Sequence, residues 1–211
     1  MLKHFTNTDI ESLDRVFRLN LMNSITGYKP AALIGSKSPE GQSNLAIFSS
    51  VVHLGSNPGL IGFIMRPTTV PRNTYSNICD TKYYTINHVH EDFIEQAHYS
   101  SAKFDENTSE FEACNLAEEY LNNFYAPYVK NSQLKIGMEL VETIDIKANG
   151  TILVIGKVID LHIAENCIQK NGRLKLEKLK TVAISGLNKY NTVSEIAEFP
   201  YARVKEVPTF K

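Results

Sequence analysis

The first 30 residues have the spacing of an amphipathic helix. Between residues 8 and 25, apolar side chains recur every three or four positions, which places them on one face of a helix. Thr8 or Asp9 is the expected N-cap, and Gly27 and Pro30 end the helix. The apolar residues of this face are Ile10, Leu13, Val16, Phe17 and Leu21.

From residue 31 onward, β-branched and aromatic residues gather in short runs that turn residues separate. Residues 134–146 and 151–163 flank Asn149-Gly150, a dipeptide typical of a tight hairpin turn. Short helices are expected over residues 90–102 and from about residue 72. The other strand-like segments cover residues 31–36, 45–55, 60–66 and 83–89.

This order of elements favours an antiparallel barrel or sandwich with helices packed on its outside. A chain of 211 residues with 43% hydrophobic content is long enough for one well-buried domain. Because no repeat, low-complexity tract or linker interrupts the sequence, we expect a single domain over residues 1–211. It comprises the helix at about 8–25, a barrel at about 28–195 and a C-terminal extension at 196–211.

Charge and cysteine content exclude several classes of protein. Lys and Arg number 22 against 23 Asp and Glu, so the formal charge of −1 creates no field that attracts nucleic acid or an anionic membrane. The three cysteines are far apart and lack a CxxC, which argues against a disulfide framework and a zinc site. The N-terminal segment contains acidic residues and no continuous apolar run. We therefore expect a cytoplasmic protein without a nucleic-acid or membrane partner.

Residues 66–78, RPTTVPRNTYSNI, concentrate hydrogen-bond donors directly after an apolar run. Arg66 ends that run, and Arg72 lies where a short helix begins. A helix N-terminus offers unpaired N–H groups and a partial positive charge, so this set of donors suits one phosphate group. In the simpler alternative Arg72 is solvated and a side chain caps the helix. The candidates for that cap are Thr69, Asn73 and Thr74.

The sequence has no GxGxxG after a strand and no GxxxxGK[ST], so it supports neither a dinucleotide-binding fold nor a P-loop. Any phosphate site must therefore be of another kind.

Read with its neighbours, the donor-rich stretch resembles the flavin reductase-like family of FMN-binding split-barrel proteins, which includes flavoredoxins and flavin reductases. The family pattern is a strand N-x-A-P-x-S, an Asn-Pro turn, an apolar strand, a segment [KR]-x-T-x-x-N that opens a helix, and a strand that ends in Asn. The matching residues here are 44–49, 57–58, 62–66, 72–77 and 85–87.

The resemblance continues beyond these motifs and covers about residues 25–195. SEF at 109–111, ILVIGKVIDLHI and ISGLNKY match later segments of the family. Three positions depart from its pattern: Ile47 replaces the proline of N-x-A-P, Asn73 replaces a frequent acid, and Lys157 replaces the glutamate of G-E-V. None of the three removes an obvious phosphate ligand.

The resemblance implies a mainly β fold, an antiparallel, Greek-key type split β-barrel with peripheral helices that include the N-terminal one. It implies FMN as the cofactor, NADH or NADPH as electron donor, and a homodimer with FMN near the interface. Because the flavin carries the hydride chemistry, no catalytic side chain is expected. The helix at 8–25 is a candidate for contact with the partner or the flavin.

The resemblance also assigns the cofactor-binding residues. Asn44, Leu45 and Ala46 are expected beside the flavin ring. Ser49 and Ser50 are expected toward the ribityl chain or the phosphate. The expected phosphate ligands are Arg66, Arg72, Thr74 and Asn77. Further contacts are expected from His98, Ser100 and Ser101, which lie in a segment that reaches the cofactor in relatives.

His88 and His90 lie close to Glu91, Asp92 and His98, but their spacing matches no strong zinc signature, so we expect no metal.

Three functions remain open. The protein is either an enzyme that passes electrons from NAD(P)H through FMN to free flavin or a protein acceptor, or a flavoredoxin-like carrier that does not react with a nicotinamide. In the third and weaker alternative, the barrel binds a ligand other than flavin.

Overall fold

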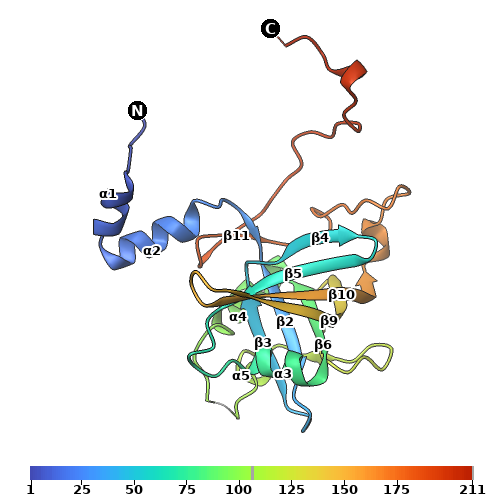
Figure 1. Cartoon of the computed structure of the whole chain (residues 1–211). Coiled ribbons are helices and arrows are strands. Elements are labelled where there is room, and N and C mark those ends of the chain that lie inside the picture. Colours follow the sequence, from blue (N-terminus) through green and yellow to red (C-terminus); the bar gives the residue numbers. More distant parts are fainter. Residues whose placement is uncertain (106, 211) are drawn as a thin grey trace.

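A computed structural model describes residues 1–105 and 107–210. Its centre is a seven-stranded sheet with the order β3-β2-β6-β9-β10-β5-β4, in which every neighbouring pair is antiparallel (Figure 1). The sheet curls into a split barrel, which confirms the predicted fold class. Its strands are β2 Ala32–Lys37, β3 Ser43–Phe48, β4 Val52–Ser56, β5 Gly59–Met65, β6 Tyr83–His88, β9 Leu134–Ile146 and β10 Thr151–Ile163.

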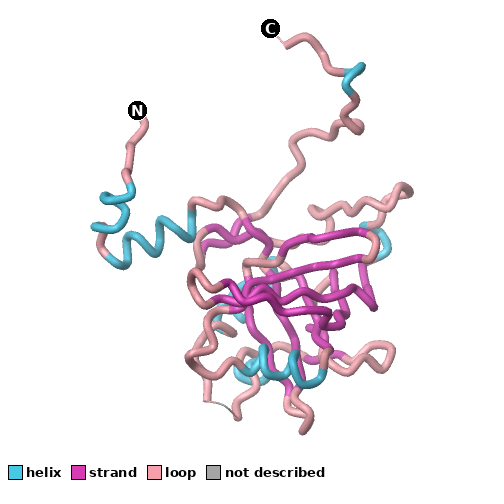
Figure 2. The backbone as a smooth tube through the Cα atoms, viewed as in Figure 1, coloured by secondary structure: helices cyan, strands magenta, loops and turns pink. Residues whose placement is uncertain are grey.

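Two small sheets and several short helices surround the barrel (Figure 2). One small sheet contains β1 Lys29–Pro30, β11 Ala183–Ser185 and β12 Lys189–Asn191. The other pairs β7 Glu118–Glu119 with β8 Tyr128–Val129. The α-helices of this region are α3 Asn73–Thr81, α4 Ile94–Tyr99 and α5 Glu110–Ala113. The 3₁₀ turns are η1 Glu91–Phe93, η2 Glu165–Cys167 and η3 Val204–Glu206.

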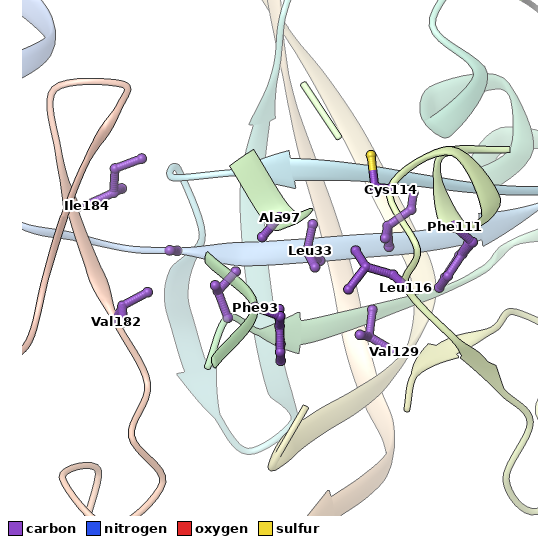
Figure 3. Packing of buried hydrophobic residues seen from close by; sticks show 12 residues of the cluster. Leu33, Phe93, Ala97, Phe111, Cys114, Leu116, Val129, Val182 and Ile184 are labelled. Carbon is purple, nitrogen blue, oxygen red and sulfur yellow. The ribbon is translucent and has the colours of Figure 1, made fainter. Parts of the chain in front are cut away.

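Strand β2 separates two hydrophobic cores, because successive side chains of a strand point to opposite faces. Ala32 and Ile34 belong to the core inside the barrel, which helix α3 closes with Ile78. Leu33 lies in the second core, on the other face of the strand. This second core also contains residues of the helices and of the late chain, among them Phe93 and Ile184 (Figure 3). Both faces of β2 are therefore covered by buried apolar side chains.

The two longest strands, β9 and β10, form the predicted hairpin. Gly150 has a φ of +72°, a conformation that glycine adopts without strain, which explains the Asn-Gly dipeptide at the turn. Two register shifts interrupt the ladder, between Ile155 and Gly156 and between Val158 and Asp160. Such bulges increase the bend of a strand, so they help the hairpin to follow the curvature of the barrel.

The N-terminal segment differs from the prediction of one helix at about 8–25. It contains two helices, α1 Asn7–Ser12 and α2 Arg15–Ser24. The break has a local cause: the carboxylate of Asp14 accepts hydrogen bonds from the N–H groups of Val16 and Phe17, and so starts a new helix. The cap of α1 is Thr6, which forms a capping box with Asp9.

Both ends of the chain extend away from the barrel. Helices α1 and α2 contain no buried residue, and the tail after β12 projects on another side (Figures 1 and 2). The strands of the three sheets lie between Lys29, where β1 begins, and Asn191, where β12 ends. Within residues 1–105 and 107–210, no helix is both long enough and apolar enough to cross a membrane.

Candidate functional site

Strand β3 forms one edge of the seven-stranded sheet, and helix α3 packs against β2 and β3. The side-chain amide of Asn44 on β3 donates a hydrogen bond to the hydroxyl of Thr74 on α3, with 2.9 Å between Nδ2 and Oγ1. Each of the two residues is 6% exposed. The fold thus brings together one residue predicted beside the ring and one predicted at the phosphate.

A second hydrogen bond lies next to the first. Asn77 Nδ2 donates to Ser36 Oγ across 3.2 Å, and both side chains are buried. Ser36 is the cross-strand partner of Asn44, and Asn77 lies three residues after Thr74 on the same helix face. These four residues form one buried group, which we call the polar cluster. Because buried polar groups stabilise a fold only when they are paired, the polar cluster fixes α3 on the sheet.

The polar cluster leaves hydrogen-bonding capacity for a ligand. The Thr74 hydroxyl is an acceptor for Asn44, and a hydroxyl that accepts one bond still has a proton to donate. Sequence reasoning did not select Ser36, because its role depends on cross-strand pairing with Asn44 and on the approach of α3.

The start of α3 is the region predicted to bind phosphate. Arg72 is its N-cap residue with a φ of −134°, and no side chain of the described residues caps this helix. The expectation that Thr69, Asn73 or Thr74 caps it is therefore wrong; Thr74 lies inside the first turn and its hydroxyl bonds Asn44 instead. Within residues 1–105 and 107–210, no side chain caps the first N–H groups of α3.

The two arginines of this region differ in setting. Arg72 is half-buried, and its Nε lies 3.4 Å from the carbonyl oxygen of Pro67, to which it donates a hydrogen bond. Arg66 follows β5 directly and is exposed. Two guanidinium groups therefore flank one short loop that leads into α3, so the region carries the positive charge that a phosphate requires.

The free edge of β3 is hydrogen-bonded to the SEF segment at residues 109–111. This segment was identified from the sequence as a family motif but was not placed at the site. The carboxylate of Glu110 on α5 accepts a hydrogen bond from the N–H of Leu45, with 2.9 Å between Oε2 and N. Ser43 lies beside it and bonds the hydroxyl of Ser109, at 3.1 Å, and the carboxylate of Glu118. Burial raises the pKa of the Glu110 carboxyl, and the bond from Leu45 opposes that shift.

The remaining residues predicted near the ring and the ribityl chain follow β3. Ala46 pairs with Ile34 across the β2–β3 ladder. Ser50 connects the end of β3 to β5: its hydroxyl accepts a hydrogen bond from Ile64 N–H at 3.0 Å and donates one to the Ile64 carbonyl at 3.3 Å. Ser49 is half-buried and lies in the bend that directly follows β3. Ser50 is therefore already in use as a link between strands.

The structure places the last three predicted residues in a separate group at the end of α4. His98 Nδ1 and the hydroxyl of Tyr190 on β12 are 3.2 Å apart and form a hydrogen bond. The hydroxyls of Ser100 and Ser101 donate to the carbonyls of Ala97 and His98. Among the described residues, this group and the polar cluster share no hydrogen bond, although α4 does contact β3.

Among the described residues, the candidate metal site and the surface hollow have fewer of the expected ligands than the region around α3 and β3. No three His, Cys, Asp or Glu side chains in residues 1–105 and 107–210 are placed to hold a metal. His90 Nδ1 accepts a hydrogen bond from the N–H of Asp92, and so acts as the cap of η1. A surface hollow of about 460 Å³ lies in the loop of residues 166–178, which carries none of the predicted cofactor residues.

Comparisons with known proteins place the chain in a family. Residues 27–176 match the model of the flavin reductase like domain. A split-barrel protein of Shewanella frigidimarina NCIMB 400, provisionally named a flavin reductase, is 46% identical with a TM-score of 0.92, and the alignment covers 95% of this chain and 100% of that one. Nitrilotriacetate monooxygenase component B of Bacillus cereus is 22% identical with a TM-score of 0.82, over 94% and 99% of the two chains.

Flavoredoxin of Desulfovibrio vulgaris (Miyazaki F) shares the fold, with 21% identity and a TM-score of 0.72 over 83% of this chain and 92% of that one. Since the family model covers well over half of the sequence, the chain belongs to the flavin reductase-like family of split-barrel proteins, whose members bind flavin.

Proposed function

We propose that the protein is an FMN-binding oxidoreductase in which NADH or NADPH reduces the bound flavin, and the reduced flavin passes electrons to free flavin or to a protein acceptor. The observation that carries this proposal is the hydrogen bond from Asn44 to Thr74. It joins the strand that the family uses for the flavin ring to the helix that begins in the donor-rich loop, so one rigid unit carries both groups of expected ligands.

The donor set suits a phosphate monoester. Arg66 and Arg72 supply charge on either side of the loop, and the first turn of α3 has no side-chain cap among the described residues. Thr74 retains a hydroxyl proton that it can donate. Charged and hydroxyl donors around a helix N-terminus are the usual elements of a site for a dianion.

The ring end of the proposed site lies along β3. This strand is an edge strand, so alternate N–H and C=O groups point away from β2 and are available to a ligand with amide-like edges. Glu110 occupies one of these positions, the N–H of Leu45. The carboxylate of Glu110 therefore positions the strand, while neighbouring backbone groups remain for the cofactor.

FMN supplies the hydride and electron transfer, and the protein supplies binding and orientation. In this proposal Arg72 and Thr74 hold the phosphate, Asn44 keeps the strand and the helix at a fixed separation, and the polar cluster prevents α3 from moving. No side chain is required as nucleophile or general base.

We also propose a homodimer, as the family resemblance implies. Helices α1 and α2 support it, because no residue of either helix is buried and the apolar side chains of Val16, Phe17 and Ile25 are exposed. Sedimentation velocity at several protein concentrations tests this proposal independently of flavin binding.

Anaerobic titration is the experiment that tests the catalytic proposal. The purified protein is loaded with FMN, and the absorbance of the bound oxidised flavin is followed after addition of NADH or NADPH. We expect one of the two nucleotides to bleach the flavin rapidly and the spectrum to recover when free flavin is added as acceptor. Bleaching no faster than that of free FMN under the same conditions would contradict the enzymatic proposal.

A flavoredoxin-like electron carrier is the second candidate, and the shared fold with a flavoredoxin favours it. A carrier binds FMN tightly but is not reduced by nicotinamides. Reduction by dithionite without reduction by NADH or NADPH would support it. Failure to bind FMN at all, seen as unchanged flavin fluorescence on titration, would contradict both candidates and indicate a different ligand for the barrel.

A further inference from the structure

The segment of residues 164–180 follows β10 and has a small hydrophobic core of its own (orange in Figure 1). Cys167 and Leu179 are buried in this core. Between them the chain turns back on itself, and the N–H of Gln169 donates a hydrogen bond to the carbonyl of Arg173 across 2.8 Å. Because its two ends are anchored and its turn is hydrogen-bonded, this segment holds its side chains at fixed positions.

Two asparagine side chains of this segment use their oxygen atoms within the segment. Asn171 Oδ1 accepts a hydrogen bond from the N–H of Arg173 across 3.0 Å. Asn166 Oδ1 accepts one from the thiol of Cys167, with 3.2 Å between the oxygen and Sγ. These bonds orient the two amides and leave their NH₂ groups as donors. Neither NH₂ group has an acceptor among the residues that the structure describes.

The hollow of about 460 Å³ lies between these amides and a set of lysines. Its lining contains three ammonium groups and no carboxylate. The lysines are Lys170, Lys175 and Lys178. Within residues 1–105 and 107–210, the ammonium groups of Lys170 and Lys178 form no ion pair or hydrogen bond, and that of Lys175 interacts only with the carboxylate of Glu177. The hollow therefore combines positive charge with amide donors.

The other cations of the same segment are already neutralised. Arg173 forms an ion pair with Glu198, and Lys180 forms one with Glu91 across 2.6 Å. The positive charge of the segment thus remains at the hollow, in a chain whose formal net charge is −1. Like charges around one hollow repel one another, and a bound anion would remove that repulsion.

Carboxylates border the hollow on one side and limit the shape of the anion that it can bind. A second hollow, of about 340 Å³, shares Gln169 and Lys175 with the first. Its other lining residues are Glu177, Glu195 and Glu198. An extended polyanion, such as a nucleic acid or an acidic peptide, would pass over these carboxylates and be repelled. The arrangement therefore favours a compact anion that is contained in the first hollow.

We propose that this hollow binds a diphosphate group, either as the free anion or as part of a nucleotide. Ammonium groups bind phosphate as compact point charges, and the amides supply donors for further oxygen atoms. A single phosphate ester carries a charge of about −1.5 to −2 at pH 7, which is less than the charge of three lysines. A diphosphate carries more negative charge and has two phosphorus centres over which the ammonium groups can be distributed. The volume also lies in the usual range of small-molecule sites, about 300–1,000 Å³.

The hollow is separate from the phosphate end of the proposed FMN site. Near its start, β10 pairs through Ile152 with Met65, the residue before Arg66. The strand ends at Ile163, where the segment of the hollow begins. Since β10 has 13 residues, its two ends lie on the order of 40 Å apart along the strand, at about 3.3 Å per residue. The diphosphate proposal therefore does not depend on FMN binding.

Isothermal titration calorimetry with sodium pyrophosphate tests the proposal. The full-length protein is loaded with FMN beforehand, so that the other expected phosphate site is filled. The wild type is compared with a double variant, Lys170→Gln with Lys178→Gln, and with Lys130→Gln. Lys130 is an exposed lysine elsewhere whose ammonium group also has no partner among the described residues. We expect the double variant to raise the pyrophosphate dissociation constant at least tenfold and Lys130→Gln to leave it unchanged.

The choice of anion tests the chemical class of the ligand. Inorganic phosphate should bind at least tenfold more weakly than pyrophosphate, and equal affinity would overturn the diphosphate assignment. ADP separates the two sources of the group: an affinity at least equal to that of pyrophosphate supports a nucleotide, and a lower affinity supports the free anion. Added sodium chloride should weaken pyrophosphate binding, because the lysines are exposed and salt screens their charge.

The outcomes that would overturn the proposal are specific to this site. No pyrophosphate binding by the wild type, or equal binding by the double variant, would contradict it. Arg72→Ala should leave pyrophosphate affinity unchanged; a loss in that variant, with none in the double variant, would place the anion at the arginine loop instead. Circular dichroism verifies the folded state, and Lys178→Gln alone replaces the double variant if the latter does not fold. Flavin fluorescence titration reports FMN binding separately, so a failure of the cofactor proposal is visible on its own.

Discussion

The side-chain amide of Asn44 donates a hydrogen bond to the hydroxyl of Thr74 across 2.9 Å, and this bond joins an edge strand to a helix from a segment 30 residues later. Next to this bond, Asn77 of the same helix donates a hydrogen bond to Ser36 of β2. Ser36 is the residue that pairs with Asn44 across the β2–β3 ladder. Helix α3 is therefore attached to two strands at once. In the proposed site this attachment sets the distance between the ring and the phosphate of FMN.

Thr74→Val should weaken both folding and FMN binding. Valine keeps the shape of threonine but leaves the buried amide of Asn44 without its acceptor, so we expect a loss of about 1–3 kcal/mol in the free energy of unfolding. FMN affinity should fall as well, because a phosphate ligand is lost. Urea denaturation and flavin fluorescence titration measure the two effects. Thr74→Ser keeps the hydroxyl and should retain most of both; equal FMN affinity in the valine variant would contradict the role of Thr74.

Arg72→Ala should weaken FMN binding by on the order of 1–3 kcal/mol, the range of a charge-assisted hydrogen bond to phosphate. The loss should shrink at high salt, because Arg72 is only half-buried and salt screens its charge. Fluorescence titration with FMN and with riboflavin isolates the phosphate contribution: riboflavin has no phosphate, so its affinity should not change. Arg173→Ala, at a distant ion pair with Glu198, serves as the control.

A similar loss for riboflavin would contradict a phosphate-binding role for Arg72 and would indicate that its substitution disturbs the loop instead.

The strands could be predicted from the sequence, because their signals are local. Alternating apolar residues and the Asn149-Gly150 turn are sufficient to locate the β9–β10 hairpin. The N-terminal helix was predicted less well, since the apolar spacing continues through Leu13 and does not reveal that the Asp14 carboxylate starts a second helix. The periodicity of side chains reports which face is apolar, but not which backbone groups a short polar side chain will bind.

The site could be predicted only in part. Asn44, Thr74 and Asn77 were selected by their place in a family pattern, and the structure shows that two hydrogen bonds connect them through Ser36 and the sheet. Glu110 was not selected, because its bond to Leu45 links positions 65 residues apart. Such pairings depend on tertiary contacts, and one sequence contains no signal for them.

The pH dependence of stability should report the environment of Glu110. Burial raises the pKa of its carboxyl above the value of about 4.5 in an unfolded chain, so the folded state binds this proton more strongly. The stability that the protonated group contributes is complete below that value and is lost as pH rises through the higher pKa of the folded state. Ionised Glu110 thus lowers stability at neutral pH.

Glu110→Gln should therefore be more stable than the wild type at pH 7, with a smaller difference at pH 4. Glutamine cannot ionise, yet its amide oxygen can still accept the hydrogen bond from Leu45. Urea denaturation at several pH values between about 4 and 7 measures the difference, and Glu112→Gln, on the exposed side of the same helix, is the control. A difference that does not change with pH would contradict the raised pKa.

Two tyrosines that are both fully buried should respond in opposite ways to the loss of their hydroxyl. The hydroxyl of Tyr84 lies inside the barrel against Gly156 and has no hydrogen-bond partner among the described residues, and its burial raises the pKa of the phenol. Tyr128 donates to Asp160 Oδ2 across 2.9 Å. Tyr84→Phe removes only an unpaired polar group, so the free energy of unfolding should stay equal or rise by about 1 kcal/mol.

Tyr128→Phe removes a bond to a charged group and should lower the same quantity by about 1.5–3 kcal/mol. Each variant loses a single oxygen atom, so the difference between them isolates hydrogen bonding from packing. Thermal and urea unfolding of the two variants, side by side, test the expectation. Equal destabilisation by both substitutions would show that the Tyr84 hydroxyl does have a partner in solution, such as a buried water in the barrel.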